Sequence, residues 1–121
     1  MARNARRLVP QDFELFSGND KVLRVTVRDE NGGIVDLTGA TIRWILSRKQ
    51  GSTPLIDYTS PTNITLASDP ATGKFDIEIS DTDSEPLRKG TFYHECLVTS
   101  AAGLKTTVMY GFVEVLKNSI V

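Results

Sequence analysis

His94 and Cys96 are the side chains best suited to catalysis, and they stand two positions apart as the only histidine and the only cysteine of the chain. Cys–His or Ser–His–Asp catalysis needs the imidazole within hydrogen-bond reach of its nucleophile. Residues i and i+2 of a β-strand share a face but lie roughly 6–7 Å apart, which is beyond that reach. We therefore expect a buried thiol, a core or edge histidine and no enzyme active site.

Acidic side chains are concentrated between residues 69 and 85, where Asp81, Asp83 and Glu85 alternate. Oxygen-rich clusters of this kind bind Ca²⁺. The segment nevertheless lacks the glycine and the distal glutamate of an EF-hand loop. We expect a solvated loop in which Asp81 or Thr82 caps one helical turn, with no metal and no other cofactor.

Three arginines, Arg3, Arg6 and Arg7, lie in a polar segment that spans residues 1–11. The formal net charge of the whole chain is −1, so there is no general attraction to nucleic acid or to an anionic membrane. The segment also lacks the aromatic residues on which bases would stack, and we expect no nucleic-acid partner. It is expected to form an extended arm, either frayed or docked on a protein.

A second candidate docking surface contains Arg43 and Ile45, which alternation places on the outer face of one strand. Arg24, Arg28 and Arg48 are also expected to point outward. The alternatives are an ordinary solvated sheet face and a protein-binding patch, since arginine is enriched in protein interfaces.

The elements that position these residues are short β-strands, because apolar and polar residues alternate with period two between turn signals. The expected strands cover residues 12–16, 21–29, 41–48, 55–58, 64–66, 74–80, 91–100 and 104–116. The segment 81–90 lacks this alternation and is expected to contain the helical turn. In the last strand, Gly111 suggests a bulge, and Val108 and Tyr110 are expected to face inward before it.

The sequence contains seven or eight short expected strands, and Trp44 faces the core from the third of them. This pattern predicts an all-β fold of the immunoglobulin-like type. We expect an antiparallel β-sandwich over residues 12–117, preceded by the arm 1–11 and followed by a C-terminal tail at 118–121. A single cysteine permits no internal disulfide. No apolar run approaches the ~18 residues that span a membrane, and no secretory signal is recognisable.

Several of these segments resemble a known family. The likeness starts with VTVRD at 25–29, Gly32, VDLTGATI at 35–42 and Trp44. It continues with residues 69–73, Asp81, Thr82, Leu87, GTFY at 90–93 and Gly103. The pattern resembles the immunoglobulin-like N-terminal domain of phage upper baseplate proteins and small phage virion proteins, over roughly residues 12–117.

The resemblance implies a structural part of a bacteriophage particle, such as a tail, baseplate, adaptor or decoration protein. Its expected partners are other virion proteins and copies of itself, with no membrane and no small-molecule substrate. It would be made in the host cytoplasm and reside in the virion. The alternative is a carbohydrate- or receptor-binding module, with or without calcium, for which Tyr58 and Tyr93 are the aromatic residues expected at the surface.

Overall fold

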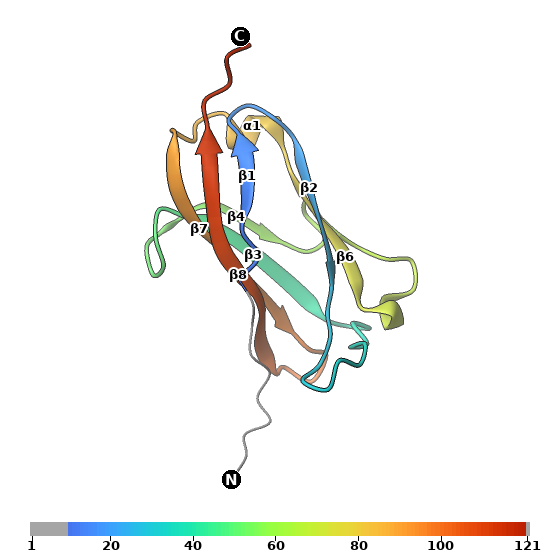
Figure 1. The fold of residues 1–121 in the computed structure, drawn as a ribbon. Coiled ribbons are helices and arrows are strands. Elements are labelled where there is room, and N and C mark those ends of the chain that lie inside the picture. The colour runs from blue at the N-terminus through green and yellow to red at the C-terminus, as the bar shows by residue number, and fades with distance from the viewer. Residues whose placement is uncertain (1–9, 121) are drawn as a thin grey trace.

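The computed structural model describes residues 10–120, which form two β-sheets packed face to face (Figure 1). The strands in chain order are β1 (Phe13–Phe16), β2 (Lys21–Thr26), β3 (Thr41–Ser47), β4 (Pro54–Thr59), β5 (Ile64–Leu66), β6 (Lys74–Ile79), β7 (Gly90–Thr99) and β8 (Lys105–Leu116). A 3₁₀ turn, η1 (Pro70–Thr72), precedes β6, and one helical turn, α1 (Asp81–Ser84), follows it. Within the described residues no helix is long and apolar enough to cross a membrane.

The strand order confirms the immunoglobulin-like sandwich. One sheet has the order β1-β8-β7-β3-β4 and the other β2-β6-β5. β8, β7 and β3 thus lie in the order in which strands G, F and C lie in immunoglobulin domains. One detail of the prediction is wrong, because the sheet is not wholly antiparallel. β1 runs parallel to β8, with Phe13 opposite Val113 and Phe16 opposite Leu116.

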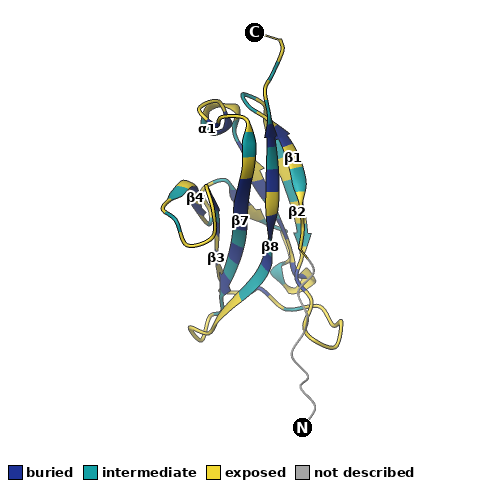
Figure 2. Cartoon of the chain, turned by 60° about the vertical axis from the view of Figure 1, so that its left-hand side comes forward, coloured by how far each residue is buried: buried dark blue, intermediate teal, exposed yellow. Residues whose placement is uncertain are grey.

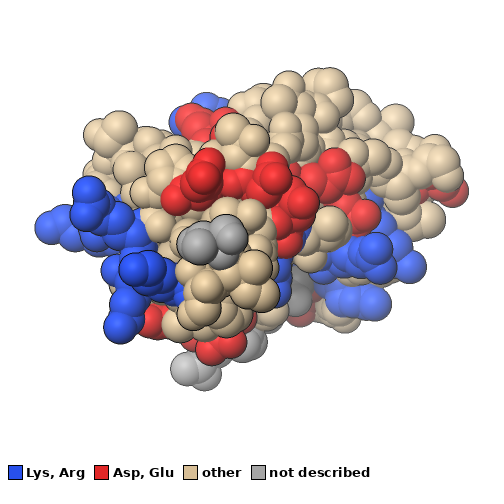
Figure 3. All heavy atoms as spheres, turned by 90° about the horizontal axis from the view of Figure 1, so that it is seen from above, with Lys and Arg blue, Asp and Glu red and all other residues tan. Residues whose placement is uncertain are grey.

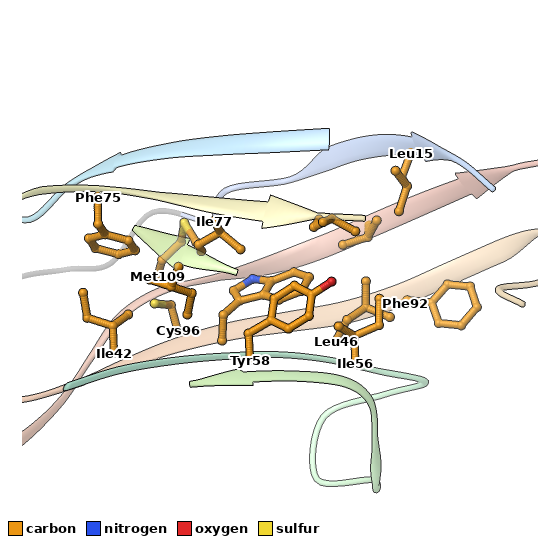
Figure 4. Packing of buried hydrophobic residues seen from close by; sticks show 14 of the residues in the cluster. Leu15, Ile42, Leu46, Ile56, Tyr58, Phe75, Ile77, Phe92, Cys96 and Met109 are labelled. Atoms are coloured by element: carbon orange, nitrogen blue, oxygen red, sulfur yellow. The ribbon is translucent and has the colours of Figure 1, made fainter. Parts of the chain in front are cut away.

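Alternating residues of both sheets build the core around Trp44, which has no exposed surface. Figure 4 shows Phe75 and Ile77 of β6 facing Ile42 and Cys96 of the opposite sheet. The inward positions predicted for β3, β6 and β7 are all buried. Burial of such side chains is the main favourable term in folding, at roughly 1.5–3 kcal/mol for each large apolar side chain.

The inward face of β8 differs from the prediction. Met109, Gly111, Val113 and Val115 are buried, and their alternation continues through Gly111 without a break. The bulge lies instead at Val108, because β7 pairs Cys96 with Met109 but Leu97 with Thr107. Figure 2 shows the resulting alternation of buried and exposed residues along the upper part of β8.

Gly111 is needed for a close approach of two chain segments. A Cβ atom at this position would stand 2.7 Å from the carbonyl carbon of Gln11 and 2.8 Å from Oδ1 of Asp12. The amide of Gln11 donates to the carbonyl of Tyr110 at 2.7 Å, and Asp12 Oδ1 accepts from the amide of Phe112 at 2.9 Å. The glycine therefore lets residues 11–12 lie directly against β8 and start the parallel pairing of β1.

Replacing Gly111 by alanine is expected to displace this segment and to lower the free energy of unfolding by about 1–3 kcal/mol, the usual range for overpacking. Urea denaturation monitored by Trp44 fluorescence measures the change. In a chain that starts at residue 13, the same substitution should lower the free energy of unfolding much less, because Gln11 and Asp12 are absent. An equal cost in both chains would contradict the explanation.

Candidate functional site

His94 is fully buried and links three parts of the chain. Nε1 of Trp44 donates a hydrogen bond to Nδ1 of His94 at 3.1 Å. An indole N–H can only donate, so Nδ1 carries no proton and Nε2 carries it. Nε2 therefore donates to the backbone carbonyl of Gln11, at 2.6 Å. The ring joins β3 and β7 to the segment before β1, and Phe13 packs edge-on against it with a centroid distance of 5.0 Å.

Burial lowers the pKa of His94 below its ordinary value, although the Gln11 carbonyl and the Asp12 carboxylate both act in the opposite direction. A protonated ring would turn an N–H toward the Trp44 N–H and lose that hydrogen bond. The neutral form is therefore part of the folded structure, as expected for a core histidine.

Cys96 lies on the same face of β7 and is also fully buried. Burial, assisted by the charge of Glu95, raises the pKa of its thiol to about 12. The thiolate is the reactive form of cysteine, and it is nearly absent at neutral pH with this pKa. The side chain serves as a small apolar residue beside Trp44, its cross-strand partner.

The acidic segment is held by its own hydrogen bonds. Ser80, not Asp81 or Thr82, is the N-cap of α1, and its side chain accepts from the amide of Asp83. Asp83 Oδ2 in turn accepts from the hydroxyl of Tyr58 at 2.6 Å. The turn ends at Ser84. Among the described residues no three His, Cys, Asp or Glu side chains are placed to hold a metal ion.

The end of the sandwich that carries α1 has both acidic and basic side chains. Figure 3 shows acidic side chains in a band across it, between two groups of Lys and Arg side chains. A field of one sign, which would steer a charged ligand toward this end, is not present on the face drawn there.

The tyrosines expected at the surface are buried, which corrects that prediction. Tyr58 stacks on Trp44 with ring centroids 5.7 Å apart, and burial raises the pKa of Tyr58 to about 12. Tyr93 lies edge-on to Phe112, and its hydroxyl donates to Glu95 Oε1 at 2.6 Å. Neither ring offers the open platform on which a sugar would stack. Phe112, half exposed, is an aromatic residue of the outer face that the alternation argument missed.

Arg43 and Ile45 lie on the outer face of the five-stranded sheet, as predicted. The guanidinium of Arg43 binds Asp57 of β4 with two hydrogen bonds, of 2.9 and 2.6 Å, and these lower the pKa of the Asp57 carboxyl. Ile45 is half-buried next to this pair. The other arginines do not join them: Arg24 lies on β2 of the opposite sheet, near Asp76, and Arg48 lies over the ring of Phe92.

This outer face is more apolar than the sequence suggested. Ile45, Leu97 and Pro54 line a shallow hollow of about 220 Å³ together with Arg43 and Glu95. On the same face, Phe112 lies opposite Tyr93 of β7 and is about half exposed, at 50%. The missed residues follow from strand register, because they occupy the positions that alternate with the buried ones. We call this surface, made of Arg43, Ile45, Asp57, Leu97 and Phe112, the outer face.

Arg3, Arg6 and Arg7 fall outside the described residues. The described chain begins at Pro10. A groove of about 490 Å³ lies between the ends of β2 and β8, lined among others by Val27, Val35, Val98 and Val108. No protein-family model matches this chain, and no curated protein is significantly similar to it in sequence.

The protonation of His94 is expected to make stability depend on pH. The unfolded imidazole binds a proton near pH 6.5 and the folded one only at lower pH, so the unfolded state holds more protons between these two values. The free energy of unfolding should therefore fall as the pH drops below about 6.5, by at most about 1.4 kcal/mol per pH unit. Urea titrations from pH 8 to pH 5 measure the slope.

The matched variant for this experiment is His94→Gln, whose amide has one acceptor and one donor group but does not titrate. Its stability should be flat over the same pH range. The carboxyls of Asp36 and Asp57, whose pKa values are lowered, lose their contribution only at more acidic pH. A slope retained in His94→Gln would show that another group is responsible.

Cys96 is expected to resist thiol reagents in the folded protein, because its thiol is buried and its pKa raised. A colorimetric disulfide reagent should react completely in denaturant and, without it, only at the rate of unfolding. Rapid stoichiometric labelling under native conditions would mean that the thiol is accessible.

Proposed function

We propose that this chain is a non-enzymatic structural module of a bacteriophage particle, part of its tail, baseplate, adaptor or decoration layer. The family assignment is supported by the resemblance of residues 25–44 and of the later segments to phage baseplate domains. The immunoglobulin-like sandwich is the fold that this resemblance implied. The chain would be made in the host cytoplasm and work in the virion, bound to other virion proteins.

The observation that carries a docking role is the outer face. It presents the apolar side chains of Ile45, Leu97 and Phe112 on one side of the five-stranded sheet, where Phe112 is about half exposed. The bidentate Arg43–Asp57 pair adds fixed polar groups beside them. Apolar anchors next to oriented charged groups are typical of the energetic centres of protein interfaces.

The side chains best suited to catalysis or metal binding have structural roles, which supports a non-enzymatic function. His94 holds Trp44 and the Gln11 carbonyl, while Cys96 is buried with a raised pKa. Asp83 accepts from the Tyr58 hydroxyl, and the Asp81 carboxylate accepts from the amide of Thr82. These groups stabilise the fold, which leaves the surface as the part of the molecule available for function.

The test uses a phage whose genome encodes the chain. The gene is deleted from that genome, and the wild-type protein or a variant is supplied from a plasmid in the host. Wild-type protein should be found by mass spectrometry in particles purified on a density gradient. Phe112→Asp should reduce its incorporation by about tenfold or more, since loss of a buried interface aromatic commonly costs over 2 kcal/mol.

The matched control is Val22→Asp, because Val22 is 47% exposed, close to the 50% of Phe112, but lies on the opposite sheet. It should incorporate like the wild type. Absence of the chain from purified particles would refute the phage assignment, whereas equal incorporation of both variants would refute docking by the outer face.

A further inference from the structure

A hollow beside α1 has two arginines in its lining. Its volume is about 180 Å³, and α1, β4, β7 and the chain segments next to them form its walls. Neither Arg48 nor Arg88 forms an ion pair with a carboxylate in the part of the chain that the structure describes. Asp83, the carboxylate in the lining, accepts a hydrogen bond from Tyr58. The hollow thus keeps a net positive charge, and we call it, with Leu55 at its side, the arginine hollow.

The other walls of the arginine hollow are apolar. Leu55 is 53% exposed, and the buried Leu87 and Phe92 lie behind it. The guanidinium of Arg48 lies over the Phe92 ring, 5.2 Å from its centroid, and this contact holds the cation in place. Because Phe92 is only 1% exposed, a nucleic-acid base would find no open ring to stack on. The hollow therefore suits an apolar side chain accompanied by carboxylates, as a protein surface provides.

The opposite edge of the five-stranded sheet carries this combination. β1 is the outermost strand there, whereas β4 is outermost on the side of the hollow. Glu14 and Phe16 of β1 are exposed and alternate with the buried Leu15, and Phe16 is 44% exposed. Glu114 of β8 lies directly opposite Glu14. We call the surface made of Glu14, Phe16 and Glu114 the glutamate edge.

The two carboxylates of the glutamate edge have no cation to balance them. Like charges on directly opposite residues of neighbouring strands repel each other, and no ion pair involves either glutamate among residues 10–120. Thr91 donates a hydrogen bond of 2.8 Å to Oε1 of Glu114, which orients that carboxylate. Asp12 adds a third negative charge two residues before Glu14, while the cation nearest to Glu114 in sequence is Lys117. An arginine from a partner would relieve the repulsion.

We propose that the glutamate edge of one copy docks in the arginine hollow of a second copy. Phe16 packs against Leu55 in this contact, and the two glutamates face the two arginines. The occupant is a second copy because this chain carries both halves, an acidic edge with an exposed aromatic ring and a basic hollow with apolar walls. Since the halves lie on opposite edges of the sheet, the contact joins copies head to tail and continues as a ring or a filament.

Sedimentation velocity at low salt, over a series of protein concentrations, tests the head-to-tail contact. The wild-type chain should form dimers and then larger species as the concentration rises, because every added copy offers a new free half. Added salt should shift the equilibrium toward the monomer, since exposed charges are screened. A chain that stays monomeric, or one that stops at the dimer, would overturn the proposal.

Charge reversal identifies the residues in contact. Glu14→Lys and Arg88→Glu should each weaken the association by about tenfold or more, because like charges would then meet across the interface. An equimolar mixture of the two variants should associate again, since each supplies the half that fits the other. Both residues are exposed, so circular dichroism should stay unchanged. A mixture as weakly associated as the separate variants would show that these two residues do not meet.

The matched controls lie on the opposite sheet. Glu78→Lys changes the net charge as Glu14→Lys does, and Arg24→Glu changes it as Arg88→Glu does. Glu78 and Arg24 are exposed on β6 and β2. Both controls should associate like the wild type. An equal loss in the controls would mean that net charge, and not this contact, governs the association.

The inference goes beyond the proposed function and does not depend on it, because neither half of the contact includes Phe112. Incorporation into particles, and its loss in Phe112→Asp, involve the outer face. A chain that stays monomeric but still enters particles would reject the head-to-tail contact and leave the docking role in place. A chain that associates as described but is absent from particles would reject only the phage assignment.

Discussion

The hydrogen bonds on the two ring nitrogens of His94 are the constraint on which the arrangement of the sandwich depends. A buried histidine is costly unless both nitrogens are satisfied. Here one accepts from Trp44 and the other donates to the carbonyl of Gln11. These two hydrogen bonds fix the Trp44 indole at the centre of the core and hold Gln11 against β8. This polar link lies within the five-stranded sheet and gives its inner face a defined geometry, since hydrogen bonds are directional where hydrophobic contacts are not.

The position of Gln11 then determines which edge of β8 is covered. Gly111 admits the Gln11 backbone, and β1 pairs upward from there to Leu116. The part of β8 below Tyr110 is left beside the groove. One contact therefore determines which part of β8 is paired with β1 and which part is not.

Much of the fold could be predicted from alternation alone, because β3, β6 and β7 each bury one face and expose the other. The prediction failed in β8, because the composition of a strand does not show where a bulge lies. Val108 is apolar and was expected to face inward, but the bulge lies there. Gly111, which suggested the bulge, instead admits the backbone of Gln11, one hundred residues away in the sequence. Tyr58 and Tyr93 were misplaced for a similar reason. Their hydroxyl partners, Asp83 and Glu95, satisfy the polar atom and let the rings be buried, and such pairings depend on tertiary structure.

The candidate surfaces were only partly predictable on the same grounds. Arg43 and Ile45 were found because strand parity places them outward, and the same parity applied to β7 and β8 would have added Leu97 and Phe112. The groove had no such signal, because it arises where two sheets diverge and no single strand encodes it. Both surfaces border strands whose inner faces are packed. A partner on the outer face would meet strands that are already paired and packed on their inner side. Little free energy would then be lost to ordering them, and this condition lets a modest apolar area give specific binding.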